Sequence, residues 1–181
     1  MFRTERLVIK PYSDDDQARM TELLTDERIR KTFMVPDLKS PEKAAAMFEK
    51  LKRWSYSGGH YEKGIYLDGT LIGFINDVEI SGGVIEVGYV IHPDFQNRGF
   101  ATETLSAAIR DLFQNGYTEV RAAAFTGNKA SRRVMEKCGM RLTGETSEVR
   151  YRGRLRKCVH YAITRDGHAS GQEGAPLASG D

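Results

Sequence analysis

A strand-turn-helix-strand pattern in the middle of the chain most constrains its fold. Val84–Ile91 is rich in β-branched residues and is followed by Pro93, so it predicts a buried strand that ends there. From Gly99 apolar residues recur at helical spacing, and Glu119–Phe125 predicts a second buried strand. Two strands joined by a helix cross over right-handedly and pair in parallel. The segment therefore predicts two parallel strands within a mixed α/β fold.

The segments on either side of this unit predict further strands and helices. Asp68-Gly69 is a strong hairpin signal between strands at residues 63–67 and 71–80. Ser40 followed by Pro41 is typical of a helix start. We also expect a first strand at residues 7–12, helices after Ser13 and at residues 129–138, and a final hairpin of residues 140–149 and 157–164.

Length and composition indicate one globular domain. The chain has 181 residues, of which 40% are hydrophobic and 29% charged, which is the balance of a soluble domain. We expect this domain to span residues 1–164. Residues 165–181 lack periodicity and bulky apolar side chains, so they predict a disordered tail. No apolar run approaches the roughly 20 residues of a membrane helix, and the N-terminus lacks secretory features, so the cytoplasm is expected.

Composition gives little support for metal or nucleic-acid binding. Cys138 and Cys158 form no Cys-x-x-Cys unit and lie near no regular set of histidines, so we expect no metal site. The net charge of +2 is too small to argue for nucleic acid. Residues 150–157, however, include five positive side chains and no acidic one. This run fits a solvated hairpin tip or a rim near bound phosphates, and also a contact with nucleic acid or an acidic protein.

The turn before the central helix is suited to holding an anion. The first N–H groups of a helix have no internal partners, and the helix dipole places about half a positive charge there, so phosphates bind at such ends. Gly99 and Ala101 are small enough for close approach, and Arg98 and Thr102 can add side-chain contacts. The glycine patterns of P-loops and dinucleotide folds are absent. From these residues alone, a phosphate site and a plain helix cap both stay open.

Several ordered motifs resemble those of the GNAT superfamily of N-acetyltransferases. Gln96-Asn97-Arg98-Gly99-Phe100-Ala101 is similar to the family signature Gln/Arg-x-x-Gly-x-Gly/Ala. Residues 86–93 and 101–103 match the flanks of that signature, and residues 128–140 match an Asn-x-x-Ser…Glu-Lys-x-Gly-Phe segment. Residues 4–11 and the closing basic hairpin resemble the branch of the ribosomal-protein alanine N-acetyltransferases. The resemblance spans about residues 3–164.

This resemblance implies a fold, a cosubstrate and an activity. The fold would be a mostly antiparallel sheet flanked by helices, with a splayed pair of parallel central strands. Acetyl-CoA would pass its acetyl group directly to a primary amine, on a protein N-terminus or a small molecule, without an acyl-enzyme or a metal. A homodimer is among the assemblies left open. The implied coenzyme A contacts are Val90, Ile91, Gln96, Asn97, Arg98, Gly99, Phe100, Ala101, Thr102 and Asn128.

Glu86 is the main candidate for the base that takes the amine proton. It shares a face of the expected strand with Gly88 and Val90, and partial burial would raise the pKa of its carboxyl. A surface glutamate paired across strands is the alternative. His92 is a rival base, because histidine titrates near neutral pH, or else a turn residue before Pro93.

The acid that protonates the leaving thiolate is less direct to identify. Many GNAT members have a tyrosine where this chain has Met135, which cannot donate a proton. Resemblance to the ribosomal branch implies Ser131 in its place, and an ordinary serine of a first helical turn is the alternative. Met135 favours a non-catalytic coenzyme A-binding or RNA-binding module on the same fold, whereas Gly99 and Glu86 favour the enzyme.

Overall fold

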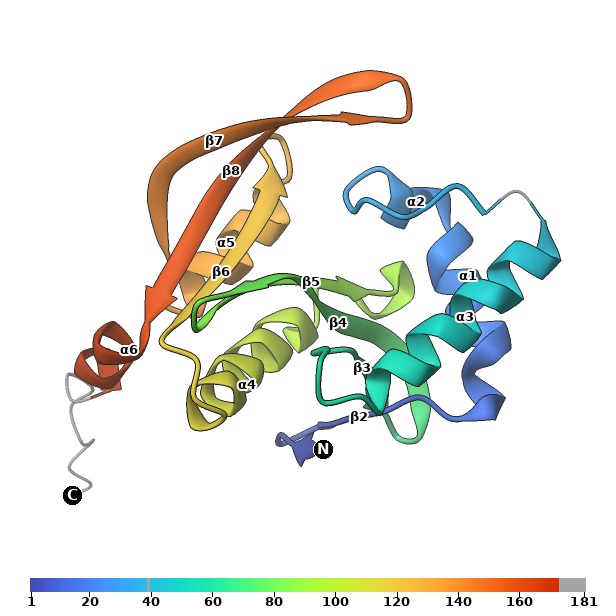
Figure 1. The fold of residues 1–181 in the computed structure, drawn as a ribbon, viewed down its shortest axis with the longest axis horizontal. Helices are drawn as coiled ribbons and strands as arrows, with labels where there is room; N and C mark the ends of the chain where they lie inside the picture. The colour runs from blue at the N-terminus through green and yellow to red at the C-terminus, as the bar shows by residue number, and fades with distance from the viewer. Residues whose placement is uncertain (39, 173–181) are drawn as a thin grey trace.

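One eight-stranded sheet organises the part of the chain that the structure describes (Figure 1). The computed structural model describes residues 1–38 and 40–172. The strand order is β1-β2-β3-β4-β5-β6-β8-β7, and each neighbouring pair is antiparallel except β5–β6. The strands are β1 (Phe2–Arg3), β2 (Leu7–Lys10), β3 (Lys63–Leu67), β4 (Thr70–Ser81), β5 (Val84–Ile91), β6 (Glu119–Phe125), β7 (Arg141–Tyr151) and β8 (Arg154–Thr164). The helices are η1 (Asp14–Asp16), α1 (Gln17–Thr25), α2 (Glu27–Arg30), α3 (Pro41–Ser55), η2 (Pro93–Phe95), α4 (Phe100–Gln114), α5 (Lys129–Lys137) and α6 (Arg165–Gln172).

The parallel pair lies inside the sheet and separates along its length. β5 and β6 pair only over the first three residues of each strand, up to Glu86 and Arg121. β5 continues to Ile91 and β6 to Phe125, each still paired on its other side with β4 or β8. A gap therefore opens between two strands that remain well anchored. The predicted mixed α/β fold with a splayed parallel pair is confirmed.

The two faces of the sheet carry two separate cores. Ile85, Val87 and Ile91 of β5 belong to the core that includes α4 and Met135 of α5. Val90 belongs to the other core, which the side chains of α1, α2 and α3 cover. Figure 1 shows these three helices gathered on one side of the molecule. The alternation of side chains predicted along β5 is thus confirmed.

The hairpin turn and the helix start that were predicted in the N-terminal half are also confirmed. Asp68 and Gly69 both have positive φ, at 48° and 81°, as the tightest hairpin turns require. Ser40 Oγ accepts a hydrogen bond from Lys43 N (3.4 Å) at the start of α3, with Pro41 in the first position.

Gly73 brings β4 unusually close to β5. It pairs with Ile91. A Cβ atom at residue 73 would fall inside the van der Waals distance of Val90 O, and would lie 3.1 Å from Val90 C and 3.2 Å from Ile91 Cα. A side chain here would push the backbone of β5 away, so the position requires glycine.

Three elements differ from the sequence predictions. β1 and α2 have two and four residues, which is too short for a periodic signal. The disorder expected from residue 165 is wrong for its first part, because Arg165–Gln172 forms α6. Arg165 anchors this helix, donating from N to Thr118 O (3.0 Å) and from Nη2 to Tyr117 O (2.6 Å). Such tertiary contacts leave no local pattern. Residues 173–181 of the expected tail lie outside the described residues.

Candidate active site

A cavity of about 470 Å³ occupies the gap between the separating strands. Its walls come from the far half of β5, the end of β6, the turn before α4 and one face of α5. Its other end reaches the segment that includes α2. The lining residues are Ile29, Thr32, Phe33, Val87, Gly88, Tyr89, Val90, Ile91, Phe95, Gln96, Asn97, Gly99, Phe100, Ala101, Thr102, Ala123, Ala124, Asn128, Ala130, Ser131, Arg133, Val134 and Lys137.

The turn before α4 presents backbone to this cavity. Asn97 (φ 60°) and Gly99 (φ 84°) adopt left-handed conformations, and Gly99 is the N-cap of α4. Gln96 Nε2 donates to Ile91 O (2.8 Å), which holds the turn against the end of β5. The unpartnered N–H groups of the first helical turn of α4 follow directly, with the small residue Ala101 among them. The geometry suits close approach of an anion.

Arg6 from the N-terminal segment braces this turn from outside. Its Nη1 donates to Arg98 O (3.0 Å), and its guanidinium lies over the Phe100 ring, 4.5 Å from the centroid. Glu103 of α4 holds Arg6 in place, accepting from the backbone N (3.0 Å) and from Nε (2.8 Å). The turn is thus held from outside by the Arg6–Glu103 ion pair (2.6 Å).

α5 forms the opposite wall of the cavity. Asn128 caps the helix, because its Oδ1 accepts from Ser131 N (3.2 Å). The Ser131 hydroxyl faces Tyr89 of β5, with 2.9 Å between Oγ and Oη. Met135 is fully buried in the core beneath the sheet.

Most of the residues predicted to contact coenzyme A line this one cavity. The predicted residues in its lining are Val90, Ile91, Gln96, Asn97, Gly99, Phe100, Ala101, Thr102 and Asn128, together with Ser131. Arg98 and Glu86 are not in it. The guanidinium of Arg98 lies 5.0 Å from the Phe100 ring centroid, on the exposed side of the turn.

Comparisons with known proteins identify the family. Residues 6–141 match the model of the acetyltransferase (GNAT) domain. The chain belongs to the GNAT acetyltransferase family. Two relatives from Bacillus subtilis are described as uncharacterized N-acetyltransferases. YnaD is 30% identical over 146 residues, which are 78% of this chain and 82% of YnaD. YoaA is 25% identical over 156 residues, which are 83% of this chain and 88% of YoaA.

A solved structure agrees with this assignment. The GNAT-family acetyltransferase from Bacillus anthracis is 25% identical, with a TM-score of 0.76, covering 91% of this chain and 98% of that one. The protein is therefore an acetyl-CoA-dependent N-acetyltransferase. Within residues 1–38 and 40–172, no group of three or more His, Cys, Asp or Glu side chains is arranged to hold a metal ion. No helix among those residues has the length and apolar character to cross a bilayer.

Glu86 of this GNAT enzyme lines a second, open hollow of about 270 Å³. The hollow also includes Glu79, Ser81, Val84 and Arg121. Burial raises the pKa of the half-buried Glu86 above its usual value, and the charge of Glu79 adds to the rise, while His160 and Arg121 oppose it. Glu86 thus sits where the paired part of β5 ends, two residues before Gly88 of the cavity wall.

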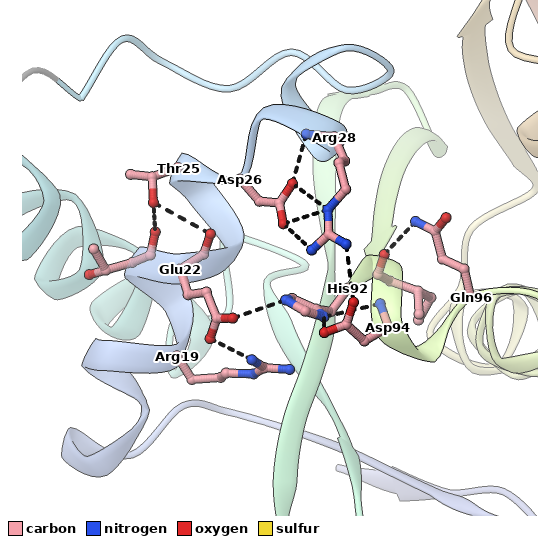
Figure 2. A network of polar contacts seen from close by, with 10 residues as sticks. Arg19, Glu22, Thr25, Asp26, Arg28, His92, Asp94 and Gln96 are labelled. Carbon is pink, nitrogen blue, oxygen red and sulfur yellow. Dashed lines mark hydrogen bonds and ion pairs between the residues drawn. The ribbon is translucent and has the colours of Figure 1, made fainter.

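His92 is buried and held away from the cavity. Figure 2 shows its ring between Glu22 of α1 and Asp94 of the following turn. Nδ1 accepts from Asp94 N (3.3 Å), so Nε2 carries the proton and faces Glu22 Oε1 (3.1 Å). Arg28 extends the link, contacting Asp26 (2.6 Å) and Asp94 (3.1 Å). Both ring nitrogens of His92 are therefore engaged, which fits the interpretation of His92 as a turn residue rather than a base. His92 ties α1 to the turn through Glu22, and Arg28 ties α2 to it through Asp94.

Among the cavity residues that the predicted contacts omit, two groups stand out. Ile29, Thr32 and Phe33 come from α2 and the segment after it, a region without a recognisable motif. Arg133 and Lys137 lie one helical turn apart on α5. Their i, i+4 spacing was visible in the sequence, and with the Asn128 motif it could have indicated a positive rim.

The basic hairpin arches across the molecule toward α2 (Figure 1). Arg152 pairs with Glu27 of α2 (2.7 Å), and Arg156 Nη2 donates to Lys31 O (3.2 Å). Tyr151 Oη accepts from Val35 N (3.3 Å). These contacts use part of the positive charge within the fold, and they fix the hairpin over the end of the cavity that the α2 segment lines.

Proposed function

We propose that this enzyme transfers the acetyl group of acetyl-CoA directly to a primary amine at the α2 end of the main cavity. One observation carries the proposal. The pairing of β5 and β6 stops at Glu86 and Arg121, and a continuous cavity runs from the helix-capping turn through that gap to Phe33. This shape fits a long cosubstrate with phosphates at one end and a thioester at the other.

The phosphates fit the turn before α4. Gly99 and its neighbours offer free N–H groups at a helix N-terminus, which attract anions. Arg133 and Lys137 add two positive charges on the rim, while Arg6, whose charge is paired with Glu103, holds the turn in place. Arg98 is exposed beside the turn, where it contributes to the local positive potential.

The thioester carbonyl fits against the end of β5. His92 N donates to Ile72 O (2.7 Å) across the β4–β5 ladder. Hydrogen-bonded and non-hydrogen-bonded pairs alternate in an antiparallel ladder, so the preceding residue, Ile91, directs its N–H away from β4 and into the gap. We therefore assign Ile91, rather than Val90, as the backbone donor that polarises the carbonyl. Removal of one such donor typically costs about 3 kcal/mol of transition-state stabilisation.

Glu86 is assigned to removal of the amine proton, and Ser131 to stabilisation of the leaving thiolate. Glu86 lies on the same face of β5 as Gly88, whose neighbour is the Phe33 ring at the amine end. Its raised pKa suits a base that takes the amine proton through water. Ser131 lies on α5, across the cavity from β5, where its hydroxyl is available to donate a hydrogen bond to the leaving thiolate.

The acceptor class and location extend this proposal. A protein N-terminus and a small-molecule amine both supply a nitrogen that becomes nucleophilic once a base has removed its extra proton. A cytoplasmic location is supported by the two free thiols, Cys138 and Cys158, because oxidising compartments favour disulfides.

Thiol release from acetyl-CoA tests the activity. The protein would be incubated with a polyamine, an aminoglycoside, free amino acids and short peptides with free N-termini, each followed by a thiol reagent. We expect at least one amine class to accelerate release above the amine-free rate. The variant Gly99→Glu, which we expect to lose the cosubstrate, is the matched control. Coenzyme A binding without release for any amine would identify a non-catalytic binding module.

A further inference from the structure

Tyr89 is the one tyrosine in the lining of the cavity, within the part of the chain that the structure describes. It extends from β5 to α5, and its hydroxyl contacts a single residue there, 2.9 Å from Ser131 Oγ and 3.1 Å from Ser131 O. The two residues are 42 positions apart in sequence. The contact therefore joins the two walls between which the thioester fits.

The hydrogen atoms in this contact can be arranged in two ways. The Ser131 carbonyl only accepts, so when Tyr89 donates to it, the serine hydroxyl donates back to the tyrosine oxygen. When Tyr89 instead donates to Ser131 Oγ, the serine proton is free to point into the cavity. A negatively charged sulfur there favours the second arrangement, because a chain of hydrogen bonds toward an anion is mutually strengthening.

Tyr89 keeps its own proton in this arrangement. Burial raises the pKa of Tyr89 well above its usual value, since a buried phenolate would lack solvation. Its role is therefore to donate to Ser131 rather than to supply a proton. Met135, at the position where many GNAT members have a tyrosine, is fully buried and offers no hydroxyl. In this chain the phenol comes from the opposite wall.

We propose that Tyr89 is a positioning residue that turns the Ser131 hydroxyl toward the sulfur of coenzyme A, so that Ser131 stabilises the thiolate. The inference rests on the proposed function, because it assumes that coenzyme A occupies the cavity. The acetyl transfer itself is the same with or without this role: the amine nitrogen bonds to the acetyl carbon, and the bond from that carbon to sulfur breaks. Tyr89 and Ser131 rearrange hydrogen bonds as the carbon–sulfur bond breaks, and the sulfur receives its final proton from solvent.

The state of the bound thiol tests the role without an acceptor amine. Binding of coenzyme A and of desulfo-coenzyme A would be measured by calorimetry across the ionisation range of the thiol, with the thiolate followed by its ultraviolet absorption. We expect Tyr89→Phe to weaken binding of the thiolate form about 5-fold, with desulfo-coenzyme A unaffected, as for loss of one hydrogen bond in a chain to an anion. Ser131→Ala should weaken it by at least as much.

A double-mutant cycle separates positioning from direct action. If Tyr89 acts through Ser131, Tyr89→Phe has no further effect in the Ser131→Ala background. Tyr161→Phe is the matched control, because the Tyr161 hydroxyl also contacts α5, at Glu136 Oε1 (2.9 Å), but does not line the cavity. It should leave the thiolate preference unchanged.

Three results would overturn the inference. An unchanged thiolate preference in Tyr89→Phe or in Ser131→Ala would show that the pair does not act on the sulfur. A Tyr89→Phe effect that persists without Ser131 would show direct action or a packing effect. Failure of the wild-type protein to bind either ligand would refute the proposed function itself, and the inference with it.

Discussion

Gly73→Ala is the substitution for which the structure gives the most direct energetic expectation. The new methyl group would overlap Val90 O and lie 3.1 Å from Val90 C, so the backbone of β4 or β5 must move. Overpacking of a tight site typically lowers the free energy of unfolding by about 1–3 kcal/mol. We take the upper end of this range, about 3 kcal/mol, because the new methyl group clashes with backbone. For a 181-residue chain, about 1 kcal/mol lowers the melting temperature by about 2–4 °C. We therefore expect a loss of about 6–12 °C.

Thermal unfolding followed by circular dichroism measures this loss. Gly59→Ala is the matched control, because no heavy atom lies within 4 Å of its added Cβ. It should leave the melting temperature unchanged or slightly raised. Since the shifted strand carries Ile91, coenzyme A affinity should fall as well in Gly73→Ala. A melting temperature within about 2 °C of wild type would refute the close approach of the two strands.

Substitutions at three further positions test the cavity and the fold. Gly99→Glu should weaken coenzyme A binding about 100-fold or more by calorimetry, since a carboxylate about 4 Å from a phosphate is repelled by up to about 4 kcal/mol. Gly99→Asn, which tolerates the left-handed conformation, should bind coenzyme A better than Gly99→Glu does. Equal affinity of the wild type and both variants would reject the site. Asn128→Ala should cost about 1 kcal/mol through loss of the helix cap, whereas Asn128→Asp should keep the cap; equal unfolding curves would contradict this. Burial raises the pKa of Glu62 from 4.5 to about 8, so stability should fall as pH rises across that interval and level off above it. Glu62→Gln should reduce this slope in melting temperature and leave the part that the raised pKa of Glu86 contributes, and an unchanged slope would assign it to groups other than Glu62.

The central unit of the fold could be predicted because its signals are local. β-branched residues in Val84–Ile91 select a strand, and alternation decides which side chains enter which core. The turn before α4 needs a left-handed backbone conformation at residue 99, and a glycine at that position in the sequence indicates it. Cofactor contacts through backbone N–H groups could be predicted for the same reason, since they follow from the positions of the strand and the helix.

The rest of the site depends on distances between segments, which no local pattern encodes. Strand alternation predicted the face that Glu86 occupies, but the place where β5 leaves β6 decides that it borders a different hollow from the main cavity. The contact between Tyr89 and Ser131 arises from packing of α5 against β5 across the gap. Phe33 reaches the cavity from the segment after α2, and Arg152 of the hairpin holds α2 in place through Glu27. These features required the assembled fold.

The early separation of β5 from β6 leaves unpaired peptide groups along two strand edges inside the molecule. Open strand edges are templates for pairing with other chains, and proteins usually cover them. A ligand that fills the gap covers these edges and binds only the folded chain, so it stabilises the fold by mass action, by about 2.7 kcal/mol at a concentration 100 times its dissociation constant. The metabolic supply of acetyl-CoA would then govern the resistance of this protein to aggregation and proteolysis as well as its rate of turnover.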